Sequence, residues 1–242
     1  MAYEFDWSVI LTYKELIFNG LIMTMKLSVL GIFFAFVIGI FIGLARAGNN
    51  FFTSLFASYY VEAFRNIPLI VQMFFIYFSI NIIEVIPFLP IVGDWLGIEN
   101  QNEFFSALAA LILYTSTYIA EAIRGGINSI SKGQAEAGKT LGMNYFQLMR
   151  LIIVPQAIKI VWGPITSQFL NLIKNSSLAM TIGVAELTFM TQEIDSLTFR
   201  GFEAATAVTL VYLILTLLTT LMMNQVDRYA LIKTKSSKNG RS

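Results

Sequence analysis

The sequence predicts an all-α membrane protein with five transmembrane helices. Of its 242 residues, 56% are hydrophobic and only 13% are charged, whereas a soluble domain is about half apolar and about a quarter charged. The apolar residues gather in long runs, and a helix needs about 20 of them to cross a bilayer. We therefore treat the chain, 1–242, as a single membrane domain. The expected spans are about 21–45, 57–83, 104–123, 155–180 and 203–226.

The composition also excludes several classes of function. The chain has no Cys, which rules out a disulfide framework and thiolate metal sites, and no His, which removes the commonest general base. No nucleophile with a neighbouring base and no cluster of metal ligands stands out, so we expect no catalytic residues, no bound cofactor and no metal. The net charge of +1 gives no indication of a nucleic-acid partner. Met1 to Trp7 carries two acidic residues and is not expected to be a signal peptide.

The first span carries small residues at every fourth place, so that they line one helix face. They are Gly31, Ala35, Gly39, Gly43 and Ala47. Such a face permits close helix contact, and we expect packing within the chain, with dimerisation through Gly39 and Gly43 as the alternative. Lys26 also lies in this span, and its ammonium is expected to extend to the interface.

The second span contains Pro68, which is expected to kink or delay the helix because proline lacks an N–H group. Glu62 and Arg65 are three residues apart, so they share a helix face and can pair. Gln72 lies deeper in the span. The connection that follows, 84–103, contains prolines that are expected to interrupt regular structure.

The third and fourth spans are unusually polar. The third carries hydroxyl groups over 114–118, and the fourth places Gln168, Asn171 and Asn175 on one face with Lys174 beside them. Polar groups in hydrocarbon need partners or water. They are therefore expected either to bond neighbouring helices or to line a solute path. The path residues predicted here are Gln72, Tyr114, Ser116, Asn171, Lys174 and Asn175, with Lys174 or Lys26 as the partner of a substrate carboxylate.

A central polar loop, 124–154, separates the third and fourth spans. Ser131 is expected to cap one short helix and Asn144 the next, with Gly142 supplying the bend between them. Pro155 suits the first turn of the fourth span. A further short helix is expected within 181–199.

Part of this loop matches a phosphate-binding pattern by letter. Gly133, Gly138, Lys139 and Thr140 spell G-x-x-x-x-G-K-[ST]. That motif needs a preceding strand and free backbone N–H groups around the phosphates. Here no strand is expected, and Glu136 would place a carboxylate in the anion site. We therefore predict a pair of helices instead of a nucleotide site.

The same loop resembles the EAA loop of ABC importer permeases, whose pattern is E-A-A, three residues, G, nine residues, I-x-L-P. This chain has Glu136-Ala137-Gly138, then Gly142, then Ile152-Ile153-Val154-Pro155, and differs at Gly138 and Val154. Further segments are similar to the polar amino-acid permease branch, and the resemblance runs from about residue 20 to 229. They are 62–77, 118–121, 124–127 and 174–178.

The resemblance implies the five-helix core of a type I ABC importer permease. It implies a membrane subunit that forms the path for polar amino acids and is coupled to a separate ATPase through Glu136, Ala137, Gly138, Gly142 and Pro155. The implied partners are a second permease subunit of the same or a related chain, two cytoplasmic ATPase subunits that carry ATP and Mg, and an extracytoplasmic substrate-binding protein. Acidic, basic and amide amino acids all remain possible substrates.

The implied location is a bacterial-type inner membrane, with the amino terminus outside and the basic tail, 228–242, in the cytoplasm. The charge distribution agrees, because the first connection, the central loop and the tail carry Lys and Arg whereas 84–103 carries none. The alternative function is an ion-coupled secondary transporter of small polar solutes. The absence of His, the lack of paired acids deep in the spans and the lack of a visible repeat argue against it.

Overall fold

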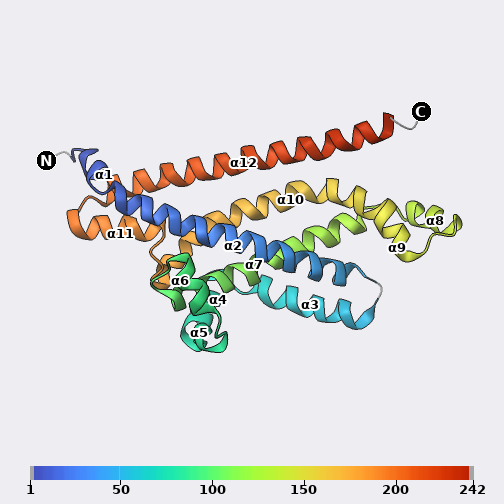
Figure 1. Cartoon of the computed structure of the whole chain (residues 1–242), viewed down its shortest axis with the longest axis horizontal. Helices are drawn as coiled ribbons and strands as arrows, with labels where there is room; N and C mark the ends of the chain where they lie inside the picture. The colour runs from blue at the N-terminus through green and yellow to red at the C-terminus, as the bar shows by residue number, and fades with distance from the viewer. Residues whose placement is uncertain (1–2, 49, 240–242) are drawn as a thin grey trace. The chain divides into compact units, whose positions relative to one another are not determined.

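A computed structural model describes residues 3–48 and 50–239, with side chains as far as Asp227, and all of the regular structure in these ranges is helical. The elements are α1 (Ser8–Thr12), α2 (Lys14–Ala47), α3 (Phe51–Asn66), α4 (Leu69–Ser79), α5 (Ile82–Val85), α6 (Leu89–Leu96), α7 (Gln101–Asn128), α8 (Lys132–Thr140), α9 (Tyr145–Leu148), the π-helix η1 (Met149–Ile153), α10 (Val154–Asn175), the 3₁₀-helix η2 (Ser176–Ile182), α11 (Leu187–Thr198) and α12 (Gly201–Asn239) (Figure 1).

Four stretches of helix are long and apolar enough to cross a membrane, and a fifth span results if the bent pair α3 and α4 is taken together. The four are Lys14–Ala47, Gln101–Asn128, Tyr145–Ile182 and Gly201–Asp227. The helical fold is therefore present, and these four candidate spans overlap the expected first, third, fourth and fifth spans and extend beyond them. The expected helix in 181–199 is α11. The predicted tail continues α12 to Asn239, and 240–242 lie outside the described residues.

The second span differs from the prediction. Instead of one kinked helix over 57–83, the chain forms two helices, α3 and α4, separated by a break at 67–68. Pro68 has a ψ of 136°, outside the helical range, because its ring blocks continuation of the helix and it lacks a donor. Beyond the break, the Gln72 side chain donates from Nε2 to the Ile67 carbonyl at 2.8 Å. The Ile67 carbonyl, which has no partner within the helix because of the break, is therefore still hydrogen-bonded.

The fourth span begins earlier than predicted. Helix runs without a break from Tyr145 to Ile182, so α9 and η1 precede Pro155, which lies in the first turn of α10 as predicted. The register shifts just before this proline, where the Val154 N–H bonds the Met149 carbonyl five residues back. A π-turn of this kind lets the helix continue although Pro155 has no N–H group to donate.

The connection 84–103 is more regular than its prolines suggested, because it contains α6 and the end of α5. Pro90 lies in the first turn of α6, where a missing N–H group has no cost. Gly97 ends that helix with a φ of 63°, in the left-handed region that favours glycine.

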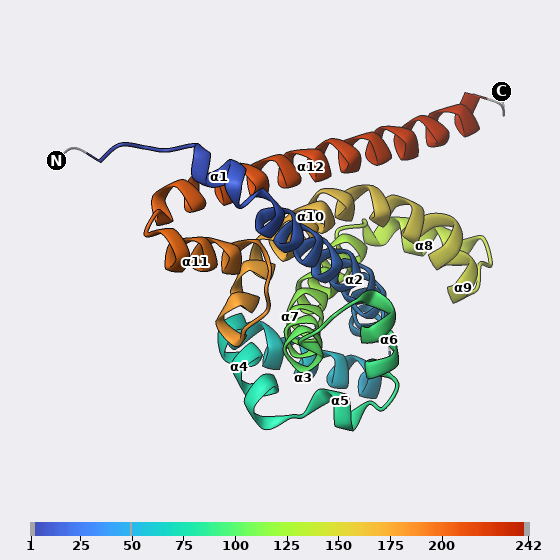
Figure 2. The same ribbon diagram turned by 60° about the vertical axis from the view of Figure 1, so that its left-hand side comes forward.

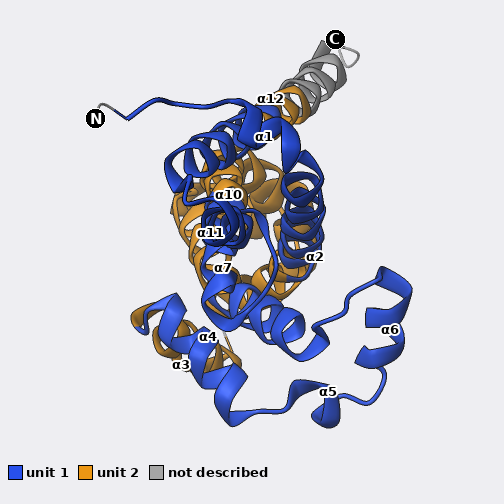
Figure 3. Ribbon diagram, turned by 90° about the vertical axis from the view of Figure 1, so that its left-hand side faces the viewer, with its two compact units in different colours: residues 1–34, 67–114, 171–218 blue, residues 35–66, 115–170, 219–242 orange. Residues whose placement is uncertain are grey.

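The chain divides into two compact units, coloured separately in Figure 3. Unit 1 contains 1–34, 67–114 and 171–218, and unit 2 contains 35–66, 115–170 and 219–242. In unit 1, α1, α11 and the beginnings of α2 and α12 lie together (Figures 1 and 2). They share an apolar core made by Ile17, Leu187, Ile194, Ala204, Ala207 and Val208.

In unit 2, the small residues of α2 face α7. A Cβ atom added to Gly43 would lie 2.8 Å from the carbonyl oxygen of Ala120, and one added to Gly39 would lie 2.6 Å from Cγ2 of Ile119. The prediction of packing within the chain is therefore confirmed at these two glycines. Their face is occupied by α7, so the dimerisation alternative is not needed to explain them.

Candidate functional site

Two short helices form the loop between the third and fourth spans. Gly142 adopts a φ of 75° between α8 and α9, which confirms the predicted bend at a position where a side chain would be strained. Asn144 confirms its predicted role, because its side chain accepts the Gln147 N–H at 2.9 Å and Gln147 bonds back to the Asn144 N–H at 3.0 Å. Ser131 occupies the N-cap position of α8, but its side chain makes no capping bond, so that expectation was wrong.

Gly138 explains how this loop is held together. It is buried, and an added Cβ would lie 2.6 Å from Cδ1 of Leu148 and 3.3 Å from Cδ1 of Ile152. The close approach packs α8 against α9 and η1, which lie side by side in both views (Figures 1 and 2). An alanine at this position would require the Cδ1 end of the Leu148 side chain to turn aside.

The outer side of the loop is exposed. Glu136 and Ala137 both lie on the surface of α8. Large apolar side chains of the same loop are also exposed, with 77% of Leu141, 57% of Tyr145 and 68% of Phe146 accessible. Sequence reasoning did not single out these three residues, although apolar residues in a polar loop were a usable signal. Exposed apolar groups that flank a carboxylate are typical of a protein-contact surface.

A cluster of charges joins α2, α3 and α7 within unit 2. Glu121 contacts three guanidinium groups, those of Arg46, Arg65 and Arg124, and Arg124 binds it through Nε and Nη2 at 3.0 Å each. Glu62 lies 3.1 Å from Arg46, and Arg65 lies 3.6 Å from Glu121. The pairing of Glu62 with Arg65 that their spacing allows is therefore replaced, because each pairs with another helix. A bidentate network of this kind is stronger than isolated surface pairs.

Unit 1 contains a shallow polar recess of about 300 Å³ beside Lys174. The side chain of Lys174 is exposed, and the Ser177 hydroxyl donates to the Lys174 carbonyl at 2.7 Å. No carboxylate is among the described residues that line it. The lining residues are Lys174, Ser177, Thr188, Thr191, Ala205, Val208, Thr209 and Tyr212.

Of the six predicted path residues, Lys174 alone belongs to the described lining of this recess. Asn171 and Asn175 are half-buried on the same helix, and Tyr114 is half-buried on α7. Gln72 is buried and bonded to Ile67, and Ser116 is buried in unit 2 with its hydroxyl 2.7 Å from that of Tyr60. The assignment of these residues to a solute path stays a prediction.

Glu186 is a buried acid that sequence reasoning did not identify. Its carboxylate accepts the Phe189 N–H at 2.9 Å, which caps α11, and the Tyr212 hydroxyl at 2.7 Å. Burial raises the pKa of Glu186, against the opposing effect of these hydrogen bonds. The carboxylate thereby holds Tyr212 at the edge of the recess. The only local signal was an acidic residue at the start of an expected helix.

Comparison with known proteins places this architecture among transport proteins. Residues 31–230 match the family described as binding-protein-dependent transport system inner membrane component. The sequence is 36% identical over 225 residues to the glutamine transport system permease protein GlnP of Escherichia coli strain K12, covering 93% of this chain and 97% of that protein. It is 33% identical over 239 residues to the glutamate/aspartate import permease protein GltJ of the same strain, covering 94% and 96%.

Solved structures agree with the sequence relatives. A crystal structure of an amino acid ABC transporter with histidines matches with a TM-score of 0.79 and 32% identity, covering 94% of this chain and all of that chain. The inward-facing MetNI methionine ABC transporter matches with a TM-score of 0.71 at 20% identity. The second likeness concerns the fold alone.

Proposed function

This chain belongs to the family of binding-protein-dependent transport system inner membrane components, and from that premise we propose that it is the permease subunit of an ATP-driven importer of polar amino acids. Membership makes it a multi-pass protein of the inner membrane. The observation that carries the proposal is the similarity, over nearly the whole length of both chains, to permeases named for glutamine and for glutamate and aspartate. Those names favour amide and acidic amino acids as the substrates.

The energy for transport comes from partners in this proposal. Lys132–Thr140, which includes the whole phosphate-loop spelling, forms the helix α8. Its backbone N–H groups therefore follow a helix axis and are not wrapped around a phosphate. This supports the assignment of ATP and Mg to two cytoplasmic ATPase subunits, with no cofactor held by this chain.

The proposed contact with the ATPase is the exposed surface of α8 and α9. Glu136 provides the charge, and Leu141, Tyr145 and Phe146 provide apolar area around it. Ala137 keeps the exposed side of α8 slim, Gly138 and Gly142 hold α8 and α9 in place, and Pro155 follows in the first turn of α10. Movement of the ATPase subunits then reaches the spans through η1, and rigid-body rocking exchanges outward for inward access.

The proposed orientation puts the amino terminus outside and the 124–154 loop and the tail in the cytoplasm. It rests on the Lys and Arg residues of those regions and on their absence from 84–103. A substrate-binding protein outside and a second permease subunit in the membrane complete the proposed assembly.

The proposed function is tested by reconstitution. The chain is expressed with its genetic neighbours, the complex is purified into liposomes, and uptake of radiolabelled L-glutamine and L-glutamate is measured with the binding protein present. We expect a second polypeptide that hydrolyses ATP to copurify, and uptake to require ATP. Uptake that proceeds without ATP and follows an ion gradient would instead establish the secondary-transporter alternative.

The proposed path predicts a role for Lys174 in binding the substrate carboxylate. Lys174→Met removes the one charged side chain among the described lining of the polar recess, and loss of a charge-assisted hydrogen bond costs about tenfold or more in affinity. We expect the KM for uptake to rise by about that factor, with unchanged amounts of protein in the membrane. Lys159→Met, an exposed lysine of α10 outside the recess, is the matched control. Equal KM values for the two variants would contradict the assignment.

A further inference from the structure

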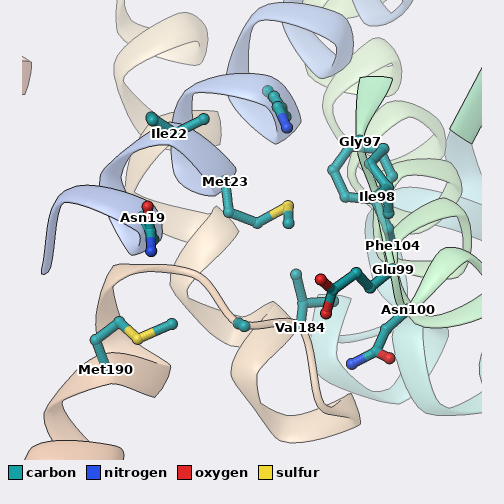
Figure 4. A pocket seen from close by; sticks show the side chains of 12 residues that line it. Asn19, Ile22, Met23, Gly97, Ile98, Glu99, Asn100, Phe104, Val184 and Met190 are labelled. Atoms are coloured by element: carbon teal, nitrogen blue, oxygen red, sulfur yellow. The ribbon is translucent and has the colours of Figure 1, made fainter. Parts of the chain in front are cut away.

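Unit 1 contains a second cavity, of about 410 Å³, that is lined by Lys26 but by none of the six residues predicted to line the path. It lies between α2, the segment that follows α6, and the loop before α11 (Figure 4). Its volume falls within the range of about 300–1,000 Å³ that is typical of small-molecule sites. Asn19 and Asn100 contribute amides to it, and Met23 and Met190 contribute flexible apolar walls.

The cavity has one group of each charge. Lys26 donates from Nζ to the Leu96 carbonyl at 2.6 Å, which fixes its ammonium at the C-terminal end of α6. An ammonium has three donors, so two remain. Glu99 is exposed, its carboxylate points into the cavity in Figure 4, and within the described part of the chain that carboxylate has no hydrogen-bond or ion-pair partner.

A fixed ammonium and an unpaired carboxylate that line one cavity complement a molecule that carries both charges itself. The two methionine side chains in Figure 4 provide adaptable apolar contacts, which accept side chains of different shapes. All α-amino acids share an α-ammonium and an α-carboxylate and differ in their side chains. A site for them needs charged groups that bind the shared part and adaptable apolar contacts for the side chain.

We propose that this cavity is a separate binding site for a zwitterionic α-amino acid, in which Glu99 receives the α-ammonium and Lys26 the α-carboxylate. The inference rests on the proposed function. Glu99 belongs to the connection that lacks Lys and Arg, so the proposed orientation puts the cavity on the external side. There it holds an amino acid before transport, apart from the recess at Lys174.

A simpler role for Lys26 is to tie α2 to α6 through the Leu96 carbonyl. Glu99 takes no part in that tie, so its substitution separates the two roles. Glu99→Gln keeps the size of the side chain and removes the charge that attracts an ammonium. Glu84→Gln is the matched control, because Glu84 is an exposed carboxylate of the same connection outside the cavity.

The test measures binding of radiolabelled L-glutamine to the purified complex in nanodiscs without the binding protein. The background variant is Lys174→Met, which weakens the recess and leaves binding at the cavity. We expect Glu99→Gln to weaken this remaining binding by about tenfold or more and Glu84→Gln to leave it unchanged. N-acetyl-L-glutamine, which lacks the ammonium, is expected not to compete.

Three outcomes overturn the inference: no binding in the Lys174→Met background, equal binding with and without Glu99→Gln, or competition by the acetylated ligand. Each is distinct from failure of the proposed function, which is judged by ATP-dependent uptake in the wild-type complex. If the complex imports glutamine but binds it equally with Glu99 and with Glu99→Gln, the proposed function stands and the second site is refuted.

Discussion

Glu136→Leu is expected to reduce amino-acid uptake at least a hundredfold while the subunit still reaches the membrane. Glu136 is exposed on α8, and its side chain makes no hydrogen bond or ion pair in the described structure. Its loss therefore changes the free energy of unfolding by no more than about 0.5 kcal/mol. At a protein interface, by contrast, removal of one partner of a charged contact leaves the other unpaired and costs about 2–5 kcal/mol.

The measurement compares ATP-driven uptake with ATP hydrolysis in the same proteoliposomes. Hydrolysis by the complex is expected to become independent of substrate and binding protein, because force no longer passes through the loop. Glu193→Leu, an exposed carboxylate on α11 far along the sequence from the loop, is the control and is expected to transport normally. Normal uptake by the Glu136→Leu variant would remove the loop from the coupling route.

Gly43→Val is expected to lower the melting temperature of the purified subunit by about 6–12 °C. The added Cβ would lie 2.8 Å from the Ala120 carbonyl oxygen and 2.9 Å from Cβ of Ile123, so α2 and α7 must move apart. The two nearest atoms belong to the backbone and to a branched carbon, which cannot swing away. Overpacking of this kind costs about 1–3 kcal/mol, and each kcal/mol corresponds to about 2–4 °C in a chain of this size.

Gly125→Ala is the matched control for this packing argument. Gly125 is an exposed glycine of α7, and an added Cβ would meet nothing within 4 Å. Alanine is favoured over glycine in a helix by about 1 kcal/mol, so this variant is expected to melt at the same temperature or slightly higher. If the Gly43→Val and Gly125→Ala variants had the same melting temperature, the contact between α2 and α7 would not be tight.

The parts of the fold that the sequence predicted are those with local causes. Apolar runs located the spans, and the requirement of Gly142 for a positive φ and the capping pattern at Asn144 located the two short helices. Pro68 gave the place of the break between α3 and α4, because its ring and its missing N–H group act locally.

The parts that the sequence did not predict depend on residues distant along the chain. Glu121 meets Arg46 across 75 positions, so the local spacing of Glu62 and Arg65 gave the wrong partners. Glu186 is buried through contacts with α11 and with Tyr212 of α12, and the residues next to it in the sequence do not indicate these contacts. The cavity at Glu99 likewise forms only when three separate segments meet.

The contact beneath Gly138 links the identities of two positions during evolution. An added Cβ at position 138 would lie 2.6 Å from Cδ1 of Leu148, the end of a flexible side chain that can turn aside. Descendants of this chain are therefore expected to gain alanine at position 138 in two ways, either with a turned Leu148 or with a shorter residue at position 148.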